Sequence, residues 1–163
     1  MMIPSLSATD SYPRAADPMA APSGARFRLP RRGARPLTFS GHELAMAMSF
    51  TPGLPYWYEI TIYRTSDQRF VLGIRQFFVS EQEKDTSDAW LFDTLPEVLD
   101  ALEVYDAGRD VVADVGGVHS RMAPAELAAQ AMELRARVEG ARHHFASLMG
   151  EFFAEMDGAA EAA

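Results

Sequence analysis

Two segments with alternating side chains, residues 56–64 and 69–79, constrain the fold of this chain most. Both are rich in aromatic and β-branched residues, which favour strands. Successive side chains of a strand point to opposite faces, so the first segment divides into Tyr58, Ile60 and Ile62 on one face and Trp57, Glu59, Thr61 and Tyr63 on the other. After a polar turn at 65–68, the second segment returns with its apolar residues on the first face: Phe70, Leu72, Ile74 and Phe78. The pattern predicts a β-hairpin with one apolar face.

Shorter patterns on both sides of the hairpin predict more strands. Large apolar residues alternate with small ones over 44–50, which predicts a half-buried strand whose inward side chains are Leu44, Met46, Met48 and Phe50. A Pro-Gly turn at 51–55 joins this strand to the hairpin. A short strand at 89–93 and an edge strand at 111–115 are expected to follow. Together these segments predict an antiparallel meander sheet of three to five strands.

A short helix is expected after the sheet. Thr94 and Glu97 have the spacing of a capping box, in which each side chain binds the other residue's backbone amide. Apolar residues then recur at helical spacing: Leu95, Val98, Leu99, Leu102 and Tyr105. Gly108 is a suitable residue to end the helix.

The last predicted element is a long amphipathic helix over about 121–157, with Pro124 in its first turn. Apolar residues recur at alternating spacings of three and four, as in a coiled coil. We expect this seam to pack against a second copy of the chain, through Leu127, Leu134, Val138, Phe145, Leu148 and Phe152. The alternative is that both halves of the helix fold back onto the sheet. The fold class is therefore α+β.

Charge divides the chain near Pro36. Residues 1–36 contain six arginines, two acidic residues and six of the ten prolines, whereas the other residues contain nine Lys and Arg against twenty-one Asp and Glu. This composition predicts a flexible arm over 1–36 and a single acidic α+β domain over 37–163. The end of the arm is basic and is able to contact phosphates or an acidic protein surface, unless it is only a solvated linker: Arg26, Arg28, Arg31, Arg32 and Arg35.

A candidate partner-binding surface lies on the second face of the hairpin. If the helices cover the first face, aromatic side chains with arginines at their margins remain on or beside the other: Trp57, Tyr63, Phe77, Arg64 and Arg75. Aromatic residues and Arg are enriched at binding hot spots, and such rings also stack on exposed bases. In the alternative interpretation the sheet is covered on both faces, and these aromatic residues belong to the core.

The sequence carries no strong catalytic or ligand-binding motif. It has no cysteine, which excludes disulfides and thiolate metal sites, and its four histidines lack the spacing of known metal motifs. We therefore expect no enzyme activity, no cofactor and no metal. No apolar run reaches the roughly 18 residues of a membrane-spanning helix, so no membrane association and a cytoplasmic location are expected.

These observations favour a non-enzymatic regulatory or protein-interaction protein. In this hypothesis the acidic body forms a homodimer through its C-terminal helix and binds a protein partner. One alternative is an acidic inhibitor that imitates nucleic acid and blocks a nucleic-acid enzyme, as a phage antagonist would, through its acidic runs at 81–85 and 97–110. The other is an accessory nucleic-acid binder that acts through the arginines of the arm.

Overall fold

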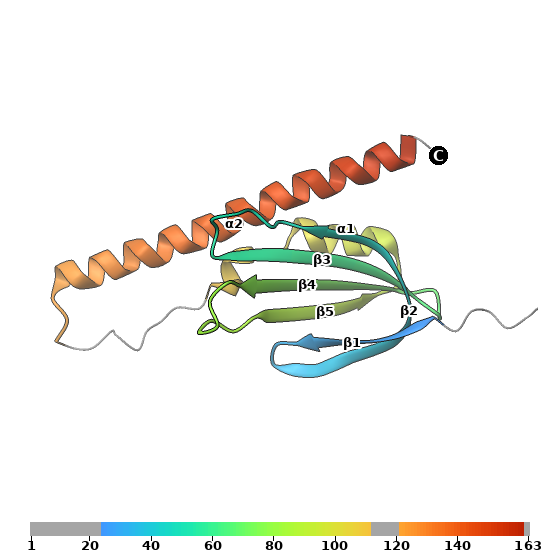
Figure 1. The fold of residues 1–163 in the computed structure, drawn as a ribbon, viewed down its shortest axis with the longest axis horizontal. Helices are drawn as coiled ribbons and strands as arrows, with labels where there is room; N and C mark the ends of the chain where they lie inside the picture. Colours follow the sequence, from blue (N-terminus) through green and yellow to red (C-terminus); the bar gives the residue numbers. More distant parts are fainter. Residues whose placement is uncertain (1–23, 112–120, 162–163) are drawn as a thin grey trace, which may run out of the picture.

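The computed structural model describes residues 24–111 and 121–161 and has the predicted α+β architecture, a curled five-stranded antiparallel sheet with helices on one face (Figure 1). The sheet contains β1 (Ala25–Arg31), β2 (Ala34–Met48), β3 (Tyr56–Thr65), β4 (Phe70–Phe78) and β5 (Thr86–Phe92). They are followed by α1 (Leu95–Glu103), the 3-10 helix η1 (Ala107–Asp110) and α2 (Pro124–Glu161). The edge strand expected at 111–115 falls almost wholly outside the described residues.

The strands follow one another in the order β1-β2-β3-β4-β5, which confirms the meander. The predicted hairpin is formed by β3 and β4, whose register runs from Tyr56 opposite Phe78 to Arg64 opposite Phe70. The sheet curls until its edge strands β1 and β5 contact each other, and the amide of Arg32 donates to the carbonyl oxygen of Ser87 at 3.1 Å.

The basic end of the expected arm belongs to this sheet. Residues 25–31 form β1 and residues 34–36 begin β2, so the prediction of a flexible arm is wrong for this part of it; residues 1–23 lie outside the described residues. Proline composition and charge suggested a linker, whereas Phe27 and Phe39, which stack across β1 and β2 at 5.3 Å, anchor both strands.

β2 is 15 residues long and bends from one partner strand to the next. It pairs with β1 up to Gly41 and with β3 from Gly41 onward, with a register shift between Glu43 and Ala45. A side chain at Gly41 would collide with the carbonyl oxygen of Arg64, so glycine is required where the strands approach most closely.

The strand predicted at 44–50 is present, but its predicted buried face is wrong. Ala45 and Ala47 lie opposite Ile62 and Ile60 and pack on the core. Three large residues point the other way and are exposed: Met46 (49 %), Met48 (46 %) and Phe50 (59 %). Leu44 lies at the register shift and is also exposed (44 %). The physical reason is that α2 passes over this part of β2, where small side chains permit the helix to approach.

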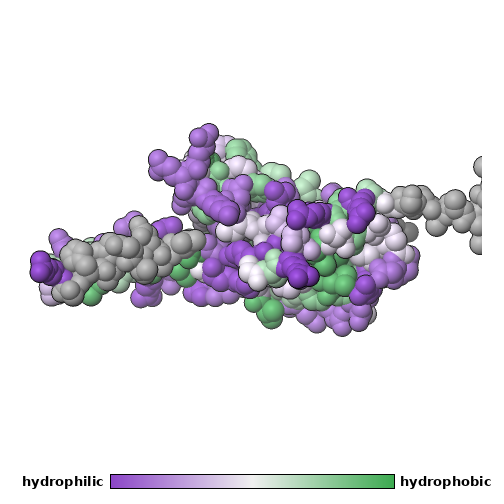
Figure 2. All heavy atoms as spheres, turned by 90° about the horizontal axis from the view of Figure 1, so that it is seen from below, coloured by the Kyte–Doolittle hydropathy of each residue, from purple (hydrophilic) through white to green (hydrophobic). Residues whose placement is uncertain are grey.

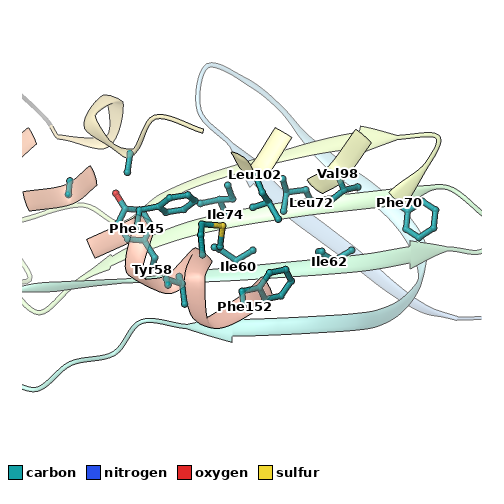
Figure 3. Packing of buried hydrophobic residues seen from close by; sticks show 14 residues of the cluster. Tyr58, Ile60, Ile62, Phe70, Leu72, Ile74, Val98, Leu102, Phe145 and Phe152 are labelled. Carbon is teal, nitrogen blue, oxygen red and sulfur yellow. The ribbon is translucent and has the colours of Figure 1, made fainter. Parts of the chain in front are cut away.

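The main core lies between the helices and the face of β3 and β4 that the sequence predicted to be apolar (Figure 3). Val98 and Leu102 of α1 cover one part of it, with the predicted capping box of Thr94 and Glu97 in place. α1 ends at Glu103, earlier than predicted, because Asp106 caps η1 instead and accepts from the Gly108 amide at 2.9 Å.

The N-terminal half of helix α2 projects beyond the sheet (Figure 1), and its later residues contribute the other part of the core. Three residues of the predicted dimer seam are buried in the protein's own core: Phe145, Leu148 and Phe152. Leu127, by contrast, is 48 % exposed, and Leu134 and Val138 are partly buried. The alternative in which both halves of the helix fold back is wrong, and the six residues do not form one free surface.

Candidate functional site

The second face of the sheet holds two groups of aromatic residues that differ in accessibility. Near β1, Tyr63 contacts Phe27 and Phe39 with ring centroids 4.7 and 5.3 Å apart, and it is buried. This small second core forms because the curled sheet brings β1 over β3 and β4. For Tyr63 the alternative interpretation, in which the sheet is covered on both faces, is therefore correct.

The other group remains accessible at the opposite end of the same face. Trp57 and Phe77 are cross-strand neighbours that stack with a centroid distance of 5.3 Å and an interplanar angle of 16°. The edge of Phe50 meets the Trp57 ring at 5.6 Å. On the other side, the Arg75 guanidinium carbon lies 4.4 Å from the centre of Phe77. We call this surface the open apolar face and define it by these residues and the exposed methionines of β2: Met46, Met48, Phe50, Trp57, Arg75 and Phe77.

The structure thus brings together three of the five predicted partner-binding residues. Arg64 lies on the opposite face, above the Phe70 ring, and donates to the Gln68 side chain at 2.9 Å. The methionines and Phe50 were missed because their alternation was interpreted as a buried pattern. Figure 2 shows one face of the body, on which hydrophobic side chains (green) lie among hydrophilic ones (purple).

A second candidate site is a buried ionic cluster between the β1–β2 turn, β5 and η1. Asp110 is 1 % exposed and accepts from Arg32 Nη2 at 2.6 Å, Tyr58 Oη at 3.0 Å and Tyr105 Oη at 2.8 Å. Asp88 accepts from Arg32 Nε at 2.8 Å and from the Arg32 backbone amide at 3.1 Å. A single guanidinium therefore bridges two buried carboxylates.

The pKa values of the three side chains that donate hydrogen bonds in this cluster are raised. Burial raises the pKa of Tyr58 and of Tyr105, and the charge and hydrogen bonds of Asp110 raise both further. Burial lowers the pKa of Arg32, but its hydrogen bonds to Asp88 and Asp110 outweigh this effect and leave the pKa above its usual value. Since each carboxylate accepts several hydrogen bonds, the cluster fits a structural clamp better than a catalytic acid or base.

The predicted basic patch is divided by this clamp. The guanidinium of Arg32 binds the buried carboxylates of Asp88 and Asp110, and Arg31 Nε donates to the carbonyl oxygen of Arg35 at 2.8 Å. Arg26, Arg28 and Arg35 remain exposed on β1 and β2. The five arginines are therefore not a single mobile phosphate-binding segment.

His144 of α2 connects the helix to the end of β2. Its Nε2 lies 2.7 Å from Ser49 Oγ, which also accepts from the Tyr58 amide at 2.8 Å, and its ring packs edge-on against Tyr56. Burial lowers the pKa of His144, as does the neighbouring His143, while the contact with Ser49 opposes this shift. The neutral imidazole is thus the form that the folded protein favours.

We expect this histidine to make the protein less stable in mild acid. Because its pKa is lower in the folded protein, the unfolded chain binds more protons as the pH falls through about 6.5, and the free energy of unfolding decreases with falling pH. His144→Gln should weaken this dependence in urea unfolding about one pH unit above and below that value. His143→Gln, at an exposed position, should preserve most of it, because burial contributes more than His143 to the lowered pKa of His144. Parallel losses in wild type and His144→Gln would contradict the assignment.

No other site of recognised chemistry appears in the part of the chain that the structure describes. Within residues 24–111 and 121–161, no group of three His, Asp or Glu side chains is placed to hold a metal ion. None of the described helices combines the length and apolar character needed to cross a bilayer. Comparison of the chain with known protein families, curated proteins and solved structures found no match.

Proposed function

We propose that this is a non-enzymatic, cytoplasmic protein-interaction protein that binds its partner through the open apolar face. The observation that carries the proposal is the exposure of Met46, Met48 and Phe50 beside the stacked pair of Trp57 and Phe77. Single exposed apolar residues are ordinary, whereas a contiguous group of them is typical of an interaction surface.

The residue types of this surface favour a protein partner. Methionine side chains are flexible and adapt to irregular apolar surfaces, and Trp and Arg are frequent hot-spot residues. Arg75 also forms an ion pair with Glu59 at 3.5 Å, so the surface has little net charge of its own. We therefore expect the partner to present apolar side chains, with basic residues where it meets the surrounding acidic body.

Nucleic acid is a less suitable occupant of the same surface. The Trp57–Phe77 stack has the chemistry of a base-stacking platform. However, the neighbouring cation Arg75 is already paired with Glu59, and the acidic body would repel phosphates. Binding of nucleic acid through the arginines of the arm is also less favoured, because Arg32 is bound to Asp110 within the protein. We find no specific observation that favours the acidic inhibitor.

The test is a double variant of the open apolar face, Met48→Ser with Phe50→Ser. The matched control is Val104→Ser, because Val104 is 80 % exposed but follows α1, on the helix-covered side. Cross-linking and affinity capture from the native host should recover the same partner with wild type and control. Affinity for that purified partner should fall by at least about tenfold in the double variant.

Two further measurements test where the partner binds and whether it is a second copy of the chain. In a Trp90→Phe background, Trp57 is the one remaining tryptophan, and its emission should shift to the blue when the partner binds. Light scattering on the wild type alone shows whether the partner is a second copy of the chain. A double variant that binds as well as the Val104→Ser control would contradict the proposal.

A further inference from the structure

A cavity of about 650 Å³ lies on the helix-covered side of the sheet, beyond the main core. Its walls come from the ends of β3 and β4, the loop before β5, the end of η1 and the middle of α2. The described residues that matter for its chemistry are Tyr56, Gln76, Phe78, Lys84, Asp110 and Arg137. Its volume is in the range of small-molecule sites, and the lining is mostly apolar.

Gln76 is the unusual residue of this cavity. It is 3 % exposed, and its side-chain oxygen Oε1 is buried without a hydrogen-bond partner among the residues that the structure describes. It occupies a position on β4 that continues the apolar series of Leu72 and Ile74, where a leucine would pack without such a cost. A buried acceptor without a donor is unfavourable and rare in folded proteins, so we expect a donor from a water molecule or a ligand to complete the site.

The other walls define what kind of ligand carries this donor. Tyr56 and Phe78 are cross-strand neighbours with ring centroids 6.2 Å apart, and they present aromatic surface to the cavity. Asp110 is not a free anion, because Arg32 and two tyrosines already bind its carboxylate. A cation therefore has no unpaired buried carboxylate to meet here among the described lining residues, and the charged residues Glu83, Lys84 and Arg137 carry both signs.

We propose that this cavity binds a neutral, planar aromatic molecule whose N–H or O–H group donates a hydrogen bond to Gln76 Oε1. The aromatic body lies against Tyr56 and Phe78. This site is separate from the open apolar face, because Gln76 and Phe78 point to the opposite side of the sheet from Phe77. Its existence does not depend on the proposed protein partner.

The experiment compares aromatic probes in which a methyl group replaces the donor hydrogen. Indole and phenol carry one, whereas 1-methylindole and anisole are their methylated counterparts without it. The probes are titrated into the full chain while the side-chain amide resonances of Gln76 are followed by NMR. We expect indole and phenol to shift these resonances and to bind at least about tenfold more tightly than their counterparts.

Variants assign this discrimination to one atom. Gln76→Leu should bind donor and methylated probes equally and should not melt at a lower temperature than wild type, because it removes the unpaired acceptor. Gln82→Leu, at another lining position, should keep the discrimination. Equal binding of both probe types to wild type, no shift of the Gln76 resonances, or discrimination that survives Gln76→Leu would overturn the proposal. The wild-type titration decides the matter even if Gln76→Leu does not fold.

Discussion

Replacing Arg32 by alanine is expected to lower the free energy of unfolding by about 3 kcal/mol. The guanidinium bridges Asp88 and Asp110, which are 7 % and 1 % exposed. Without it, Asp110 keeps its two tyrosine donors, but both carboxylates lose the cation that offsets their burial. Because the same contact fastens the β1–β2 turn to β5 and η1, we expect urea unfolding to show the loss, with amide exchange fastest in β1.

Arg109→Ala is the matched control for this prediction. Arg109 lies 3.8 Å from the same Asp88 carboxylate, but its side chain is 54 % exposed, so its removal should cost less than about 1 kcal/mol. Arg32→Lys should fall between the two, since a single ammonium group does not reproduce the bidentate geometry. Equal effects of Arg32→Ala and Arg109→Ala would show that the bridge does not stabilise the fold.

The parts of the fold that local patterns determine were predictable from the sequence. β3 and β4 alternate so regularly that their pairing and their apolar face followed from residue types alone. The capping box at Thr94 is similarly local, because both partners lie within one helical turn. In each case the interactions that decide the structure join residues close in sequence.

Features that depend on distant partners were not predictable in the same way. Alternation over 44–50 indicates a strand, but either of its faces fits a core until the position of α2 is known. Ala47 faces the helix and Met48 faces outward because the helix needs a close approach. Similarly, nothing local distinguishes Arg32 from the neighbouring arginines, since its partner Asp110 is 78 residues away.

In the candidate site, too, the features set by local patterns were predictable and those set by distant residues were not. Trp57, Phe77 and Arg75 were predicted to share a face because they belong to the hairpin, and they do. Tyr63 has the same position in the alternation as Trp57, yet β1 covers it. The composition of residues 24–36 concealed that strand, so no local pattern indicated the difference in accessibility.

The largest expected effect comes from Phe145, which fixes α2 to the body. Its ring lies 5.3 Å from that of Tyr58 and 4.9 Å from that of Tyr105, and the residue is 4 % exposed. Phe145→Ala should lower the free energy of unfolding by about 3–5 kcal/mol, because it removes a buried ring and leaves a cavity between helix and sheet. Urea unfolding followed by near-UV circular dichroism measures this loss.

The matched variant, Leu127→Ala, lies on the same helix and in the same predicted seam, but in the half that projects from the body (Figure 1). In a monomer it should change the free energy of unfolding by less than about 1 kcal/mol, because the side chain is 48 % exposed. In a dimer that packs along the projecting half, its effect should be larger and should increase with protein concentration. Similar losses for both variants at all concentrations would contradict the packing of α2, because Phe145 is buried against Tyr58 and Tyr105 whereas Leu127 is half exposed.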